Sequence, residues 1–133
     1  QPEEIEFYNR RSGFRVDAMS DLHLDLLVYS MDEGWIPDTS MSARLDDLSV
    51  GGCGVITEGP VPGGVRLRFG LRLGEHEFEV MAECVHSEPP RWPRRGWRHG
   101  LCFTELDDPV RNRLYQEIMQ QERALLRKRS HQV

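Results

Sequence analysis

The sequence predicts a mainly β fold, a six-stranded antiparallel β-barrel followed by a C-terminal α-helix. Between residues 22 and 103, short segments of alternating apolar and polar residues recur at regular intervals, separated by turns rich in Gly and Pro. After Asp107, the apolar residues recur with helical spacing instead. The chain has 133 residues, which is enough for one domain that buries its own core.

The alternating segments predict the positions of the strands. Strands are expected at residues 22–28, 41–45, 53–56, 65–73, 77–84 and 97–103. In the first of them, one face is expected to hold Leu22, Leu24, Leu26 and Val28. The segment Asp32–Thr39 contains Gly34 and Pro37 and is expected to be a loop. A hairpin is expected at Gly74, with arginines of one strand facing glutamates of the next.

The last segment carries the signals of a helix start. Asp107 and Asp108 precede Pro109, and these residue types are favoured at the N-cap and in the first turn. The apolar residues that recur at helical spacing before Arg129 are Val110, Leu114, Ile118 and Leu125. We therefore expect three parts: residues 1–15 as an N-terminal linker with an arginine motif, residues 16–106 as the barrel, and residues 107–130 as the helix.

Composition and charge argue against several classes of protein. The formal net charge is −5, whereas a domain that mainly binds a nucleic acid backbone is usually basic. Cys53, Cys84 and Cys102 lie far apart in apolar surroundings and are expected to be buried free thiols. There is no CxxC pair and the histidines lack ligand spacing, so no metal site is expected. No apolar run is long enough for a membrane span, and we expect a cytoplasmic protein.

Two polar clusters contain the side chains that a purine nucleotide site requires. The segment Asp47–Gly52 connects two expected strands and supplies a carboxylate, the Ser49 hydroxyl and two glycines. The other cluster contains Arg10, Arg11 and Arg15. Guanidinium groups donate to phosphate oxygens and to guanine O6 and N7, and a carboxylate accepts from the N1–H and 2-amino groups of guanine. Adenine lacks these two donors and O6, so the combination favours guanine.

These clusters resemble the two sequence motifs of PilZ domains, the bacterial receptors for cyclic di-GMP. Arg11-Ser12-Gly13-Phe14-Arg15 is similar to the RxxxR motif, and Asp47–Gly52 is similar to the [DN]xSxxG motif. The resemblance extends from Arg10 to the C-terminal helix and implies the same six-stranded barrel with a helix. It also implies cyclic di-GMP as the ligand, with no metal.

The resemblance implies a role for each residue of the two motifs. Arg11 and Arg15 would bind phosphate and the Hoogsteen edge of guanine, with a guanidinium group stacking on a base. Asp47 would bind the other edge of guanine. Ser49 would contact a phosphate or hold the corner, and Gly52 would let the ligand approach the backbone.

The residue before the first motif bears on the number of ligands. In family members that bind an intercalated pair of dinucleotides, an arginine at the place of Arg10 helps to hold the second molecule, so two ligands per domain are expected. The resemblance further implies a non-enzymatic receptor in which ligand binding draws residues 10–15 onto the barrel.

The resemblance also suggests a larger protein and its partners. The chain is similar to the C-terminal half of two-domain flagellar brakes of the YcgR type, with a PilZ unit of a polysaccharide synthesis protein as the alternative. The expected partner is an adjacent domain or a protein such as the flagellar motor or a polysaccharide synthase. A homodimer is compatible with the sequence.

Two other functions fit parts of the sequence. The Arg91–Trp97 loop interleaves arginines with Trp92 and predicts, as the alternative, a small β-barrel that binds nucleic acid. The simpler interpretation of that loop is a surface turn whose tryptophans pack on the barrel rim. A hydrolase that uses Ser49 is disfavoured because the chain has no G-x-S-x-G elbow.

Overall fold

The computed structural model describes residues 14–15, 21–73 and 75–130, which form seven strands and one helix. The strands are β1 (Phe14–Arg15), β2 (Asp21–Ser30), β3 (Gly34–Leu48), β4 (Gly52–Thr57), β5 (Arg66–Leu73), β6 (His76–Glu88) and β7 (Trp97–Glu105), and the helix is α2 (Asp108–Ser130).

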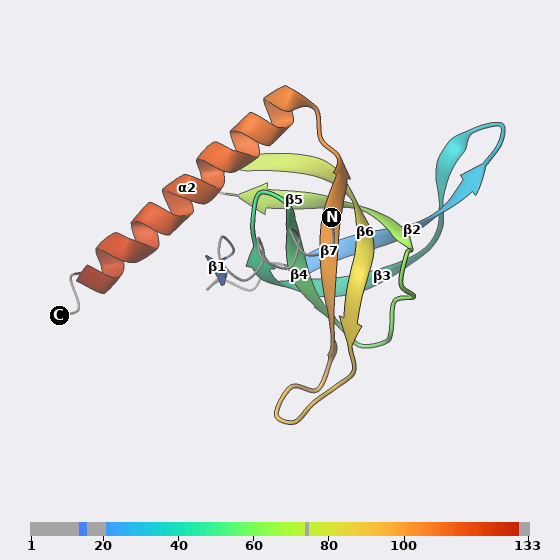
Figure 1. Ribbon diagram of the computed structural model, residues 1–133, viewed down its shortest axis with the longest axis horizontal. Helices are drawn as coiled ribbons and strands as arrows, with labels where there is room; N and C mark the ends of the chain where they lie inside the picture. Colours follow the sequence, from blue (N-terminus) through green and yellow to red (C-terminus); the bar gives the residue numbers. More distant parts are fainter. Residues whose placement is uncertain (1–13, 16–20, 74, 131–133) are drawn as a thin grey trace.

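Strands β2 to β7 form a closed antiparallel ring (Figure 1). Hydrogen-bonded neighbours follow the order β3-β2-β5-β6-β7-β4, and β4 pairs back with β3. The short β1 pairs with the end of β3. The prediction of six antiparallel strands and one C-terminal helix is confirmed. Closure gives each long strand a partner on both sides over part of its length, which limits exposed sheet edges.

The core fills this ring with alternate side chains of the long strands. Along β5, Leu67, Phe69 and Leu71 are buried, as the alternation predicts. On the outer side of the same strand pair, the Arg68 guanidinium lies 3.5 Å from the Glu79 carboxylate. The predicted pairing of arginines with glutamates across the outer surface is therefore present at this position.

The hairpin between β2 and β3 differs from the prediction. Residues 32–33 lie in the turn as predicted, but the rest of the segment Asp32–Thr39 is not a loop, because β3 begins at Gly34 and pairs with β2 from there. Pro37 lies opposite Leu27, where the register of the two strands shifts. A strand accommodates a proline at such an irregularity, so Pro37 was a poor indicator of a loop.

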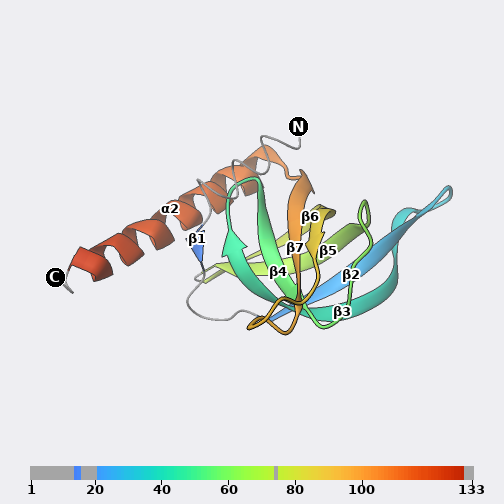
Figure 2. The same ribbon diagram turned by 60° about the horizontal axis from the view of Figure 1, so that its bottom comes forward.

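The predicted inner face of β2 is buried only as far as Leu26. Leu22 and Leu24 are buried as predicted, and Leu26, which pairs with the buried Leu67, packs partly buried against the core, but Val28 is 44% exposed. The expected buried position of Val28 is therefore wrong. The outer part of the β2–β3 hairpin projects from the ring as an arm (Figure 2).

Helix α2 packs on the ring through a narrow apolar face. Leu114 and Ile118 are buried, and Val110 is partly buried against the core. The N–H of Arg111 donates to the carbonyl of Asp107 at 2.8 Å, at the predicted helix start. Both views show the helix running from the ring at the end opposite to the β2–β3 arm (Figures 1 and 2). No helix within the described ranges is long and apolar enough to cross a membrane.

The three cysteines are free thiols. Cys53 and Cys84 are buried as predicted, whereas Cys102 is only partly buried, which corrects the expectation for that residue. Burial raises the pKa of both the Cys53 and the Cys102 thiols, so both stay protonated near neutral pH.

Candidate ligand-binding site

The corner between β3 and β4 is held by the hydroxyl and the backbone of Ser49. Its N–H and its Oγ both donate to the carbonyl oxygen of Gly52, at 2.9 and 3.2 Å. The side chain is almost fully buried, with 1% of its surface exposed. Ser49 thus holds the corner, one of the two roles expected for it, and its contact with a phosphate stays a prediction.

The backbone around Gly52 lies against the neighbouring strand β7. A Cβ atom at this position would overlap the carbonyl oxygen of Leu101. In addition, the N–H of Phe103 donates to the carbonyl of Gly51 at 2.9 Å. Packing alone therefore requires glycine at position 52, and the approach of a ligand to this glycine stays a prediction.

A β-bulge turns two consecutive carboxylates to the same side of β3. Leu45 pairs with Val55 and Asp47 pairs with Gly54, so Asp46 is an additional residue between two regular pairs. In a regular strand, Asp46 and Asp47 would point to opposite faces. Here both are partly buried on the outer side, between the inward-facing residues on either side of them.

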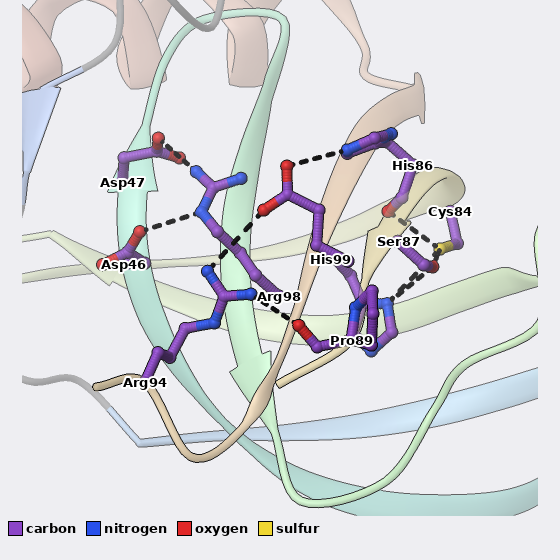
Figure 3. A network of polar contacts seen from close by, with 10 residues as sticks. Asp46, Asp47, Cys84, His86, Ser87, Pro89, Arg94, Arg98 and His99 are labelled. Carbon is purple, nitrogen blue, oxygen red and sulfur yellow. Dashed lines mark hydrogen bonds and ion pairs between the residues drawn. The ribbon is translucent and has the colours of Figure 1, made fainter. Parts of the chain in front are cut away.

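Both carboxylates bind the guanidinium group of Arg98 on β7 (Figure 3). Arg98 Nη2 donates to Asp47 Oδ2 at 2.7 Å, and Arg98 Nε donates to Asp46 Oδ2 at 3.1 Å. Arg98 reaches over β4 at Gly54, where a Cβ atom would lie 2.5 Å from both Arg98 Nη2 and Asp47 Oδ1. Glycine at position 54 therefore leaves the space that this ion pair occupies.

Sequence reasoning missed the partnership of Asp46 and Arg98. The signal for the bulge was the spacing of three residues between the inward-facing Leu45 and Leu48, which breaks the alternation of a strand. No motif or spacing pointed to Arg98, because only the pairing of β4 with β7 brings it near Asp47.

The arginine motif meets the corner through β1. The backbone of Arg15 pairs with Asp47, and Phe14 pairs with Leu48. The last two residues of the first motif therefore pair with the first two residues of the second motif. Arg10 and Arg11 lie outside the described residues.

A second polar cluster lies on the inner side of β7. The Thr57 hydroxyl donates to the Gly59 carbonyl at 2.6 Å, so its oxygen accepts from Nε2–H of His99 at 2.9 Å. Nδ1 of His99 lies 2.8 Å from the Ser87 hydroxyl, which also lies 3.3 Å from the carbonyl oxygen of Val61 (Figure 3). His99 is completely buried, and burial lowers its pKa below the usual value. The ring is therefore neutral and has a partner on each nitrogen.

The loop between β6 and β7 does not gather its basic and aromatic side chains on one surface. Trp92 is 92% exposed, whereas Trp97 is partly buried and stacks on His99 with a ring distance of 6.4 Å. Arg94 folds back and donates to the carbonyls of Pro89 and Gly96. Trp97 agrees with the expected packing on the rim, but the expectation for Trp92 is wrong.

In the part of the chain that the structure describes, no group of three His, Cys, Asp or Glu side chains is placed to hold a metal ion.

Comparisons with solved structures identify the fold. The PilZ domain of YcgR from Escherichia coli, solved with c-di-GMP, is 21% identical, with a TM-score of 0.60, and the match covers 93% of this chain and 99% of that chain. The YcgR structure from Escherichia coli in complex with c-di-GMP is also 21% identical, with a TM-score of 0.66 and coverages of 93% and 51%.

A third solved structure is the Bacillus subtilis inhibitor of motility MotI. It is 19% identical, with a TM-score of 0.62, and the match covers 85% of this chain and 51% of that chain. The present chain thus spans about half the length of these YcgR and MotI chains. Among curated protein sequences there is no significant match.

At the level of sequence families, the model described as PilZ domain matches residues 9–120. The matched range includes the arginine motif (Arg11–Arg15), the corner motif (Asp47–Gly52), the seven described strands and the packed part of α2. The chain therefore belongs to the PilZ domain family.

Proposed function

We propose that this chain is a receptor domain for cyclic di-GMP. The proposed ligand residues are Arg10, Arg11, Arg15, Asp47, Ser49 and Gly52. The observation that carries the proposal is the pairing of Arg15 with Asp47 across β1 and β3. This pairing brings the end of the RxxxR motif beside the start of the DxSxxG motif. The Escherichia coli YcgR PilZ domain, a structural neighbour, was solved with this ligand.

The chemistry of the corner fits one edge of guanine. The Asp47 side chain is 18% exposed, and its backbone pairs with Arg15 of β1. Its oxygens accept hydrogen bonds only, and the N1–H and 2-amino groups of guanine supply donors at matching spacing. Arg11 and Arg15 supply the complementary donors for guanine O6 and N7 and for the phosphates.

The proposed output is a change in the N-terminal segment. Ligand binding orders residues 10–15 against the corner and alters how the domain meets an adjacent domain or protein. We propose a cytoplasmic, non-enzymatic regulator of motility, with exopolysaccharide output as the alternative. The division into a linker at residues 1–15, a barrel at 16–106 and a helix at 107–130 is part of the same proposal.

Titration calorimetry with cyclic di-GMP tests the proposal. The wild-type chain binds, and Arg11→Ala and Asp47→Ala each weaken binding by about 100-fold or more, because each removes charge-assisted hydrogen bonds. Arg72→Ala is the matched control, since Arg72 is an exposed arginine on β5. If folded wild-type protein gives no heat of binding, the receptor proposal is wrong.

The number of ligands has its own test. Arg10→Ala lowers the calorimetric stoichiometry from two towards one, while Arg72→Ala leaves it unchanged. A ratio of two that survives Arg10→Ala removes Arg10 from the second ligand site.

A further inference from the structure

We propose that Arg98 is a specificity-determining positioning residue, which holds the Asp47 carboxylate in the orientation that reads the N1 and 2-amino edge of guanine. Arg98 is part of neither sequence motif. The inference rests on the proposed cyclic di-GMP function and extends it to a residue on the far side of β4.

The first support is the two-point contact that Arg98 makes. Nη2 holds Asp47 and Nε holds Asp46, at 2.7 and 3.1 Å, and the guanidinium plane is thereby fixed. An arginine with one contact can rotate about that contact, but two carboxylates on different residues remove this freedom. The orientation of Asp47 is therefore set before a ligand arrives.

The second support is that Arg98 leaves Asp47 able to bind a ligand. Arg98 uses one hydrogen bond to Oδ2, and each carboxylate oxygen can accept more than one. A ligand that covers Asp47 takes a charge out of water, which is costly unless an opposite charge stays beside it. Arg98 lies beside Asp47 Oδ2 and provides that charge.

The third support is the shape of β4 between the two partners. Gly54 lies opposite Asp47 and opposite Gly100 in the sheet. The absence of a side chain at position 54 is what allows Arg98 to cross β4, as the 2.5 Å approach to a hypothetical Cβ shows. The bulge on β3 turns Asp46 and Asp47 to the same side, and Gly54 on β4 leaves space for Arg98. Both features allow the same ion pair.

The test compares two ligands that differ by one donor. One is cyclic di-GMP, and the other is the cyclic dinucleotide with hypoxanthine in place of guanine, which lacks the 2-amino group. We expect the wild-type chain to prefer cyclic di-GMP by about tenfold or more, the effect of one hydrogen bond to a charged group. In Arg98→Gln this preference falls to about twofold or less, and the affinity for cyclic di-GMP falls by about tenfold.

Two further variants separate positioning from general damage. Arg98→Lys keeps the charge but lacks the fork that contacts both carboxylates, so its preference lies between those of wild type and Arg98→Gln. Arg94→Gln is the matched control, because Arg94 pairs with Glu88 on the adjoining hairpin and contacts neither aspartate in the described structure. It leaves the preference unchanged.

The outcomes are distinguishable. If the wild-type chain binds neither ligand, the proposed function fails and this inference falls with it. If wild type binds and prefers guanine, but Arg98→Gln and Arg98→Lys keep the full preference, the inference alone is overturned. Tighter binding by Arg98→Gln also overturns it, because Arg98 would then compete with guanine for Asp47.

Discussion

Arg98 and His99 are neighbours in the sequence, but they belong to opposite kinds of polar environment. Arg98 lies on the outer side of β7 between two carboxylates, and its side chain is 24% exposed. His99 points inward, is completely buried and is neutral, with a hydroxyl partner on each ring nitrogen. The alternation of a strand thus separates a charged cluster from a neutral one by a single residue.

This difference assigns different tasks to the two clusters. The inner cluster has neutral donors matched to acceptors, and a broken pair there leaves a buried polar group unsatisfied. The outer cluster has two partly exposed carboxylates, with 24% of the Asp46 and 18% of the Asp47 side chain exposed, and Asp47 pairs with Arg15 of β1. We therefore expect changes on the inner side to lower stability, and changes on the outer side to lower ligand affinity.

The largest expected effect is that of His99→Ala on stability. The change leaves Thr57 and Ser87 without their buried partner and opens a cavity, so the free energy of unfolding falls by about 3 kcal/mol. Urea denaturation followed by circular dichroism measures it. His86→Ala is the control, because His86 is exposed on β6, and it changes the free energy by less than about 0.5 kcal/mol. Equal effects of the two variants would remove the distinction between the inner and outer sides.

The next effect is that of Gly54→Ala on binding. The added Cβ displaces Arg98 Nη2 and Asp47 Oδ1, which are the ends of side chains and can move. We expect cyclic di-GMP affinity to fall by about tenfold, with a loss of unfolding free energy below about 1 kcal/mol.

Gly100→Ala provides the matched control for this change. Gly100 pairs with Gly54 across β4 and β7, but a Cβ there would meet only the Cβ of His86 at an ordinary 3.5 Å. Affinity is expected to stay within about twofold of wild type. If Gly54→Ala binds like wild type, the ion pair over position 54 does not contribute to recognition.

The corner and its partner Arg98 differ in how far the sequence predicts them. The corner was predictable because Asp47, Ser49 and Gly52 form a short local motif, and the ring because alternation marks each strand. Arg98 was not, since its meeting with Asp47 depends on the pairing of β3, β4 and β7 and on a bulge at Asp46. Such contacts between distant segments leave no local pattern.

The β2–β3 hairpin shows the same limit in the fold. Local rules placed a loop at Pro37, but the register shift opposite Leu27 accommodates the proline within a strand. Beyond the shift, Val28 is 44% exposed although it continues the alternation of the buried Leu22 and Leu24. The residue types of this segment are compatible with a turn or with a strand, and the pairing of β3 with β2 makes residues 34–39 a strand.

A smaller effect concerns the pH dependence of stability. Burial lowers the pKa of His99 in the folded state, so below the ordinary histidine value near 6.5 the unfolded chain binds a proton that the folded chain does not. The contribution of His99 to the free energy of unfolding is therefore fully present above that pH and is lost as the pH falls below it. Between about pH 7.5 and pH 5.5, wild type loses up to about 1 kcal/mol more than His99→Gln. If the free energy of unfolding changes equally with pH in the two proteins, His99 is not neutral in the folded state.

The smallest expected effect is that of Asp46→Ala on binding, and it tests how the outer cluster works. Asp46 supports Arg98 and is not among the proposed ligand residues, so its removal lets the guanidinium rotate and lowers cyclic di-GMP affinity by about threefold. Asp38→Ala, an exposed aspartate on the same strand, is the control and leaves affinity unchanged.

The decisive measurement is a double-mutant cycle of Asp46→Ala with Arg98→Gln. Because Asp46 is expected to act through Arg98, its removal should cost nothing further once Arg98 is glutamine. Additive losses would show that Asp46 affects the ligand independently of Arg98. The outer cluster would then be a set of separate charges and not one coupled unit.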